Sequence, residues 1–452
     1  MPQTPSDWER LDKEFIWHPF TQMGDWLKET PLIIASGDGS YLTDVNGKRY
    51  LDGISSLWVT VHGHRRREIN EAIVAQLDRV AHSTFLGLSH QPAIELAQRL
   101  VAASPKGLAK VFYSDNGSTA VEISLKMAFQ YWRQCPDPST SKDTFISFTN
   151  GYHGDTIGSV SVGGMDLFHK IYKPLLFSTI QAPSAYCYRC YLNKEYPGCG
   201  MACLGDVEEI ISKNRERVAA VIMEPLVQAA GGMLVYPRGY TRGVRDLAAK
   251  YGLMFIADEV ATGFGRTGAM FACQQEGIEP DFMAVAKGIT GGYLPLAATL
   301  TTQQAFEAFC GEYKDKITFF HGHTYTANPL ACAAALANFD IFEKDKTLDK
   351  LRDKIAWLGK GLQGFRKLKH VGDVRQLGFM VGIELVKDPD TKEAYPYEEK
   401  IGIKVIQEAR RRGLIIRPLD SVIVLMPPLS ISKKEMEQLL EITYDSIKAV
   451  TE

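Results

Sequence analysis

No segment of this sequence is long and apolar enough to form a membrane-spanning helix. Such a helix needs about 18 or more consecutive apolar residues, and no run in the 452 residues reaches that length. The opening stretch MPQTPSDWERLDKEF is polar and carries acidic side chains, unlike a secretory signal peptide. We therefore expect a cytoplasmic protein that does not contact membranes.

Excess charge and a disulfide framework are also missing. The formal net charge is −2 at pH 7, which gives no reason to expect nucleic-acid binding. Eight cysteines in 452 residues are too few for a disulfide-rich secreted scaffold. With 45% hydrophobic and 23% charged residues, the composition is that of a globular protein large enough for two or three domains.

Four of the eight cysteines are clustered. Their spacing is Cys187-x2-Cys190-x8-Cys199-x3-Cys203. Four thiolates can form a closed zinc site or hold an iron–sulfur cluster. Because the spacing matches no standard zinc ribbon or finger, we favour a loop of reduced thiols without metal.

Strands and helices alternate through the middle of the chain. Apolar, strand-like segments occur at 111–114, 145–148, 219–224, 253–258 and 282–286, and helix-favouring segments separate most of them. This alternation predicts one mostly parallel α/β domain.

The two ends of the chain depart from this pattern. The first part combines loops with short strand signals, including an Asn46-Gly47 hairpin signal. The last part mixes two helices with apolar strands. We predict an N-terminal arm that forms part of the small domain (1–66), a large α/β domain (67–345) and a small α+β domain (346–452).

Two apolar segments of the middle domain each end in a charged residue. LMFIAD ends at Asp258 and FMAVAK ends at Lys287, with glycines close behind. Such runs predict buried strands that deliver an acid and an amine to the carboxyl edge of the sheet, where ligands bind. Either residue alone would more simply be a surface residue, so the prediction of a site depends on the pair.

This acid and amine suit pyridoxal phosphate (PLP). A lysine forms a Schiff base with an aldehyde cofactor only when its amine is partly deprotonated, which burial among apolar neighbours favours. Lys287 is the candidate for that amine. An aspartate beside the ring nitrogen keeps it protonated, so that the ring withdraws electrons, and Asp258 is the candidate for that role.

A possible phosphate loop follows the strand-like segment at 111–114. Gly117 lets the backbone approach an anion, while Ser118 and Thr119 offer hydroxyl groups at the start of a predicted helix. The alternative is purely structural, because Thr119-x-x-Glu122 also has the pattern of a helix capping box.

Two more loops carry aromatic or histidine side chains. The glycine-flanked segment 151–154 holds Tyr152, which could stack on a cofactor ring or simply pack in a turn. Segment 320–325 has two histidines but no further metal ligand nearby. We favour phosphate binding by Thr324 over a metal site there.

Together, these motifs resemble the class III aminotransferases of PLP fold type I. The resemblance rests on Lys287, on DEVATGFGRTG (258–268), on the Gly-Ser loop at 117–118 and on GYHG (151–154). It implies an α/β fold with a mostly parallel central sheet in the large domain and a smaller α+β domain. It also implies a PLP enzyme that forms a homodimer with its active site at the subunit interface.

The resemblance assigns roles to individual residues. Lys287 would hold the cofactor, Asp258 would meet its ring nitrogen, and Tyr152 would stack on the ring, so that these three are catalytic. Part of the phosphate site would come from the partner subunit, through its residues 323 and 324. The residues implied to bind the cofactor are Gly117, Ser118, Tyr152, Asp258, Lys287, His323 and Thr324.

The segments WHPFTQM (17–23) and SSLW (55–58), with Arg417, narrow the resemblance to members that convert 8-amino-7-oxononanoate to 7,8-diaminononanoate in biotin synthesis. Arg417 would bind the substrate carboxylate in a bidentate manner. Many members have Tyr in place of Phe20 and Trp in place of Leu57, which leaves the amino donor open between S-adenosylmethionine and lysine. The residues implied to bind substrate are Phe20, Leu57, Tyr152, Lys287, Gly322 and Arg417.

Two other functions stay open. The general motifs also suit an ω-aminotransferase for ornithine, 4-aminobutyrate or β-alanine, although WHPFTQM and Arg417 argue against it. A PLP-binding regulator without catalysis would need neither Lys287 nor Asp258 intact, and the sequence has no DNA-binding appendage.

Overall fold

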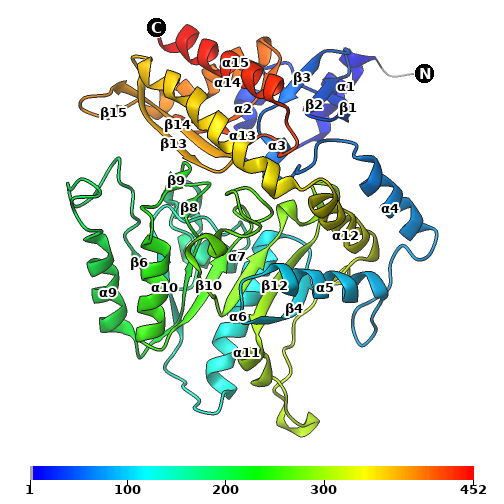
Figure 1. Ribbon diagram of the computed structural model, residues 1–452, viewed down its shortest axis with the longest axis vertical. Coiled ribbons are helices and arrows are strands. Elements are labelled where there is room, and N and C mark those ends of the chain that lie inside the picture. The colour runs from blue at the N-terminus through cyan, green and yellow to red at the C-terminus, as the bar shows by residue number, and fades with distance from the viewer. Residues whose placement is uncertain (1–3) are drawn as a thin grey trace.

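The computed structural model describes residues 4–452, and its largest element is a seven-stranded sheet at the centre of the molecule (Figure 1). The sheet order is β4-β12-β11-β10-β7-β5-β6. Only β12 runs against its neighbours, so the prediction of a mostly parallel sheet is confirmed. The strands are β4 (Leu108–Ser114), β5 (Thr144–Phe148), β6 (Ile180–Ala182), β7 (Val218–Met223), β10 (Met254–Asp258), β11 (Phe282–Val285) and β12 (Ala297–Thr302).

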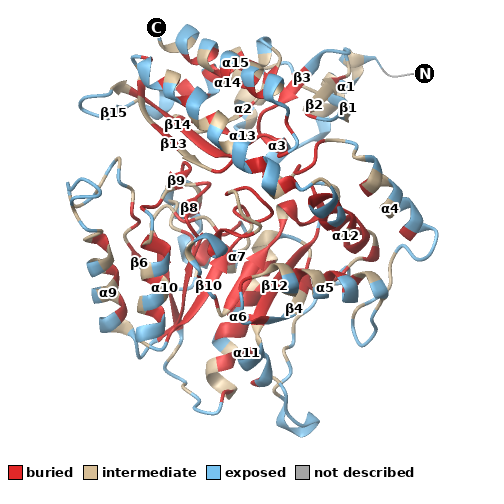
Figure 2. Ribbon diagram, viewed as in Figure 1, coloured by how far each residue is buried: buried red, intermediate tan, exposed pale blue. Residues whose placement is uncertain are grey.

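Helices cover both faces of this sheet. Alternate side chains of a strand point to opposite faces, and in β10 the pair Met254 and Ile256 packs in one core cluster while Phe255 and Ala257 pack in another. The central strands β7, β10 and β11 are buried along their whole length (Figure 2). Because both of their faces are covered, β7 and β11 are wholly apolar and β10 is apolar up to Asp258. One face meets α6 (Gly117–Gln134), and the other meets α5 (Gln91–Ala103), α9 (Cys203–Asn214), α10 (Tyr240–Lys250) and α12 (Pro329–Lys344).

The N-terminal and C-terminal parts of the chain form a second body above this sheet (Figure 1). A four-stranded sheet joins three N-terminal strands to β16, which pairs in parallel with β3. The hairpin predicted at Asn46-Gly47 connects β2 and β3. The strands of this sheet are β1 (Ile34–Asp38), β2 (Tyr41–Asp44), β3 (Arg49–Asp52) and β16 (Leu414–Ile415).

An antiparallel five-stranded sheet completes the second body. Ser432 caps the last helix with the predicted capping box. The domain boundaries at residues 66 and 345 stay a prediction. The strands are β13 (Val371–Leu377), β14 (Met380–Asp388), β15 (Glu393–Ala394), β17 (Arg417–Leu419) and β18 (Val422–Leu425), and the helices are α13 (Thr347–Leu362), α14 (Ile401–Arg411) and α15 (Lys433–Thr451).

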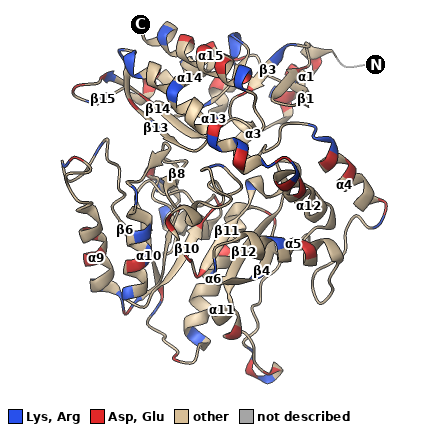
Figure 3. Cartoon of the chain, in the orientation of Figure 1, with Lys and Arg blue, Asp and Glu red and all other residues tan. Residues whose placement is uncertain are grey.

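Short elements fill the remaining connections. Along α4, basic and acidic residues are mixed (Figure 3). Within residues 4–452, every helix is too short or too polar to cross a membrane. These elements are α1 (Pro5–Phe15), α2 (Met23–Trp26), α3 (Ser55–Trp58), α4 (Arg67–Leu77), α7 (Ile157–Ser161), α8 (Asp166–His169), α11 (Gln303–Glu307), β8 (Val227–Gln228) and β9 (Leu234–Val235).

One buried arginine ties the bodies together. Arg266 is 1% exposed and donates hydrogen bonds to the backbone carbonyls of Thr60, at 2.9 Å, and Pro427, at 2.8 Å. Burial lowers the pKa of Arg266 to about 10, so the group keeps its charge at neutral pH. It therefore joins the loop after β10 to segments from both ends of the chain.

His62 makes the stability of the fold sensitive to acid. It is buried against α12, with its Nε2 3.3 Å from the carbonyl of Asn338, and burial lowers its pKa from 6.5 to about 4. Between about pH 6.5 and pH 4 this imidazole is therefore protonated in the unfolded chain but neutral in the folded chain, so acid favours unfolding. When the pH falls from 7 to 5, we expect the free energy of unfolding to decrease by about 2 kcal/mol more in wild type than in His62→Gln.

Melting temperatures at the two pH values measure this difference. Val74→Gln, which places a glutamine at an exposed position without removing a titratable group, is the control and should keep the wild-type pH dependence. Equal losses in wild type and His62→Gln would contradict the prediction.

Candidate functional site

A cavity of about 470 Å³ lies at the carboxyl edge of the central sheet. Its wall includes residues that follow five strands in turn: 115–118 after β4, 152–154 after β5, Glu224 after β7, Asp258 at the end of β10 and Lys287 after β11. Its size is that of a small-molecule site. Ligands of α/β sheets bind at this edge, so the acid and amine predicted from the sequence do share one cavity.

Lys287 enters the cavity directly after β11. Its backbone φ is 45°, a left-handed conformation that few residues other than glycine adopt. Its Nζ lies 5.3 Å from the centre of the Trp58 ring. Burial lowers the pKa of Lys287, although the carboxyl groups of Asp258 and Glu224 oppose the shift. The amine is therefore a better nucleophile at neutral pH than an exposed lysine.

Asp258 is held by two hydrogen bonds at the end of β10. His153 Nδ1 is 2.6 Å from one carboxylate oxygen, and the backbone N–H of Val260 donates to the other at 3.0 Å. The side chains of Asp258 and His153 are 3% and 1% exposed. This fixed, buried carboxylate is suited to hold a proton on a nitrogen of a bound ring.

Two residues of this wall were missed in the sequence. His153 belongs to the GYHG motif, but nothing in the sequence indicates that it reaches Asp258. Glu224 could have been found, because it follows the apolar run VIM as Asp258 follows LMFIA.

Glu224 is a buried carboxyl group beside the amine. It accepts hydrogen bonds from the backbone N–H groups of Tyr152, at 3.2 Å, and Ala229, at 2.9 Å. Burial raises the pKa of Glu224 to about 7. The group therefore titrates near neutral pH, where an acid–base residue is most effective.

The loop after β4 leads into a helix start that suits an anion. Asn116 caps α6, since its side chain accepts from the Thr119 N–H at 3.1 Å. The predicted Thr119-x-x-Glu122 capping box is therefore wrong, because α6 begins two residues earlier. Glu122 instead accepts from the N–H of Gly158 at 2.6 Å. The first turn of α6 offers N–H groups without partners in the helix.

The glycines around this helix start allow close packing. A Cβ on Gly117 would lie 2.6 Å from a methyl carbon of Val260, and a Cβ on Gly154 would collide with Ser118. Ser118 Oγ also accepts from the N–H of Asp155 at 3.2 Å. Gly117 and Ser118 are thus held at the cavity wall, where a phosphate group would meet the helix N-terminus.

The cavity as a whole fits PLP. The Lys287 amine matches the cofactor's aldehyde, the buried Asp258 matches its ring nitrogen, and the start of α6 matches its phosphate. Tyr152 also lines the cavity, and its hydroxyl donates to Asp155 at 2.7 Å. Burial raises the pKa of Tyr152, so its hydroxyl stays neutral.

The other predicted site residues lie outside the wall of this cavity. Phe20 and Leu57 are 57% and 47% exposed. His323 pairs at 2.8 Å with Asp115, which does line the cavity. The remaining ones are Gly322, Thr324 and Arg417.

Arg417 lies in β17 and is half-buried. Burial lowers its pKa, as expected for a guanidinium without a nearby carboxylate. No acidic side chain among residues 4–452 lies within ion-pair distance of it. Arg417 is therefore free to pair with an acid from outside the chain.

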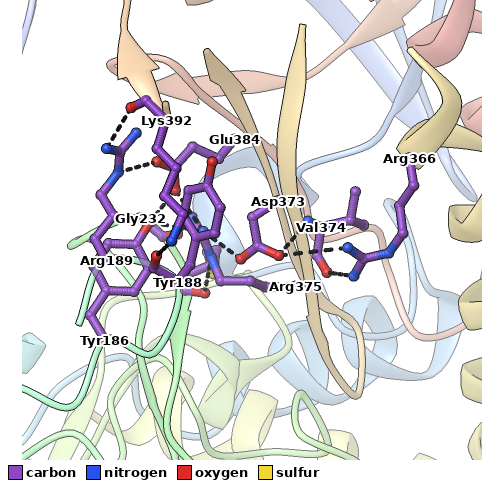
Figure 4. A network of polar contacts seen from close by, with 11 residues as sticks. Tyr186, Tyr188, Arg189, Gly232, Arg366, Asp373, Val374, Arg375, Glu384 and Lys392 are labelled. Atoms are coloured by element: carbon purple, nitrogen blue, oxygen red, sulfur yellow. Dashed lines mark hydrogen bonds and ion pairs between the residues drawn. The ribbon is translucent and has the colours of Figure 1, made fainter. Parts of the chain in front are cut away.

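A buried ion network joins the small antiparallel sheet to the turn at Gly232 (Figure 4). Arg375 in β13 pairs with Glu384 at 2.6 Å and donates to the carbonyls of Gly232, at 2.8 Å, and Met233, at 3.1 Å. These carbonyls belong to the turn that carries Ala230 into the cavity wall. The small antiparallel sheet thus holds one wall of the site in place.

Comparison with known proteins agrees with this geometry. Residues 23–447 match the family model of class-III aminotransferases. The chain is 56% identical over 450 residues to the adenosylmethionine-8-amino-7-oxononanoate aminotransferase of Geobacter sulfurreducens, with 99% of this chain and 98% of the relative covered. It is 53% identical to the protein of the same name from Aquifex aeolicus, with 98% of each covered.

Two solved structures share the fold. The adenosylmethionine-8-amino-7-oxononanoate aminotransferase of Methanocaldococcus jannaschii has a TM-score of 0.94 and 47% identity, with 98% of this chain and 99% of the other covered. An (S)-enantioselective omega-transaminase from Thermomicrobium roseum has a TM-score of 0.95 and 35% identity, with both chains fully covered.

The packing of Gly154 on Ser118 generates a testable prediction. The backbone φ of Gly154 is 122°, which is unfavourable for residues other than glycine. A methyl group in Gly154→Ala should displace Ser118 from the helix start, and the Kd for PLP should rise by about tenfold or more. Titration of the apoenzyme with PLP, followed by absorbance, measures this change.

Gly205→Ala provides a matched control, because a Cβ on Gly205 in α9 meets no atom within 4 Å. Its Kd for PLP should equal that of wild type. Wild-type affinity in Gly154→Ala would show that Ser118 does not hold the phosphate.

Proposed function

Because the chain belongs to the class III aminotransferases, a PLP-dependent enzyme family, we propose that it transfers an amino group to 8-amino-7-oxononanoate and forms 7,8-diaminononanoate in biotin biosynthesis. The observation that supports this proposal most strongly is a sequence identity of 56%, over nearly the full length, to a relative named for this substrate. The identity to an omega-transaminase of the same fold is 35%. The ω-aminotransferase alternative for ornithine, 4-aminobutyrate or β-alanine is therefore the second candidate.

The amino donor we propose is S-adenosylmethionine, which the names of the relatives contain. Lysine is the alternative donor. It is supported by Phe20 and Leu57, because a phenol and an indole at these positions would offer polar contacts that this chain lacks. The proposed cytoplasmic location stays a prediction.

Six wall residues have proposed tasks in this reaction. Bound PLP supplies an aldehyde that combines with amines and a ring that withdraws electrons. Lys287 would hold the cofactor through its amine, and the same weakly basic amine would move a proton at the reacting carbon of the substrate. Asp258, fixed by His153, holds the proton on the ring nitrogen. Gly117 and Ser118 bind the phosphate, and Tyr152 packs on the ring.

Arg417 has the chemistry to bind the substrate carboxylate. A guanidinium presents paired N–H donors that match the two oxygens of a carboxylate. Phe20, Leu57 and Gly322 complete the proposed substrate site.

We also propose that the enzyme is a homodimer. Exposed side chains in the segment around His323, including Phe320 at 77% and Tyr325 at 62%, are typical of a surface that another subunit covers. In the dimer, His323 and Thr324 of the partner subunit would reach the phosphate.

The half-reactions test both the reaction and the donor. Wild-type enzyme with bound PLP should lose its visible absorbance when S-adenosylmethionine is added, and adding 8-amino-7-oxononanoate should restore it and release 7,8-diaminononanoate. Lys287→Ala, which lacks the amine that moves the proton, should show neither change. Stopped-flow absorbance and mass spectrometry follow the two steps.

Three other outcomes are informative. Loss of the visible absorbance with lysine but not with S-adenosylmethionine would show that lysine is the amino donor. Conversion by ornithine, 4-aminobutyrate or β-alanine, with no reaction of 8-amino-7-oxononanoate, would establish the ω-aminotransferase. Turnover by Lys287→Ala at the wild-type rate would refute the proposed role of Lys287.

Arg417→Lys tests the carboxylate contact. A lysine offers a point charge instead of two parallel donors, so the KM for 8-amino-7-oxononanoate should rise by about tenfold or more while bound PLP is retained. Arg412→Lys, a surface change near the end of α14, is the matched control. An unchanged KM in Arg417→Lys would place the carboxylate elsewhere.

A further inference from the structure

The four clustered cysteines surround one small cavity. Cys187, Cys190, Cys199 and Cys203 all line a space of about 20 Å³, which has room for about one water-sized atom. It lies apart from the PLP cavity, whose wall contains no cysteine. The fold therefore brings all four cysteines to the wall of one cavity.

The segment that carries these cysteines has little regular structure to stabilise it. Residues 183–202 form neither helix nor strand, and loops of this length are uncommon in compact domains unless they are functional. Tight turns follow the second and third cysteines, where the Asn193 N–H donates to the backbone carbonyl of Cys190 at 3.0 Å and the Ala202 N–H donates to the backbone carbonyl of Cys199 at 3.2 Å. Cys203 then begins α9.

We propose that the four cysteines bind one zinc ion as thiolates. Taken separately, the pairs Cys187-x2-Cys190 and Cys199-x3-Cys203 have ligand spacings found in structural zinc sites, although the eight residues between the pairs are fewer than in a standard ribbon or finger. No carboxylate or histidine lines the cavity, and an all-sulfur set favours zinc or iron over magnesium or calcium. The space suits one ion better than an iron–sulfur cluster of several atoms.

The charge of an occupied site can be balanced locally. Zinc binds thiolates, so its binding would displace the protons of the four thiols. Four thiolates and Zn²⁺ leave a net negative charge, and Lys194 at the cavity wall offsets part of it. No three ligand side chains among residues 4–452 are already grouped to hold a metal; the ion would draw the thiols inward.

Zinc at this position would fix a segment that docks on the small antiparallel sheet (Figure 4). The Tyr186 hydroxyl donates to Glu384, and Arg189 Nε donates to the same carboxylate at 2.7 Å. Lys392 Nζ donates to the carbonyl of Tyr188 at 2.8 Å. These residues flank Cys187 and Cys190, so loss of the ion should loosen this contact and lower the melting temperature.

Metal analysis of the full-length PLP enzyme, purified from zinc-supplemented cells, tests the proposal. We expect about one zinc per chain in wild type, and less than about a tenth of that in Cys190→Ser and Cys203→Ser. Cys310→Ser, an exposed cysteine outside the cluster, is the matched control and should retain the zinc. Retained PLP absorbance checks that each variant is folded.

Cobalt provides a readout that does not depend on the variants. After a mercurial reagent and a chelator remove the zinc, and thiol reduces the protein, cobalt(II) chloride should produce sulfur-to-cobalt charge-transfer bands with one equivalent bound. Wild type without zinc and without these bands would overturn the proposal. Iron with visible absorption before treatment would overturn it, as would fewer than eight free thiols in denatured protein that reductant restores, since that result indicates disulfides.

Discussion

The ionisation of Lys287 is the constraint on which the site depends. Burial favours the neutral amine, whereas Asp258 and Glu224 favour the charged one, and burial prevails. The raised pKa of Glu224 helps, because a carboxyl group that is partly protonated near pH 7 attracts the ammonium less. His153 contacts the Asp258 carboxylate at 2.6 Å and holds it in place. The reactive amine is therefore produced by the surrounding groups together and not by any single neighbour.

Local signals in the sequence predicted much of this arrangement. Apolar runs that end in Asp258 and Lys287 correctly indicated buried strands with polar ends, and the resemblance to class III aminotransferases is confirmed. The start of α6 was misplaced, because Asn116 and Thr119 compete as caps and only the folded backbone decides between them. The contact of His153 with Asp258 joins residues far apart in sequence, so no local pattern could reveal it.

Support for the site also comes from a distance. Arg375 and Glu384 belong to the small sheet, yet they hold the turn that brings Ala230 to the cavity. Arg266 similarly holds the backbone at Thr60 and at Pro427, in the N-terminal and C-terminal parts of the chain. A paired charge in a buried position is costly to break, since the remaining partner is left without compensation. Substitutions far from the cavity can therefore change its shape.

The pairing of β3 with β16 has a consequence for synthesis on the ribosome. The β1–β3 hairpins emerge early, but their sheet partner at 414–415 is made hundreds of residues later. At ordinary translation speeds that interval is roughly 20 to 70 seconds. During it, the open edge of β3 is available to pair with other chains. The order of the strands along the chain therefore leaves this edge without its native partner until synthesis is almost complete.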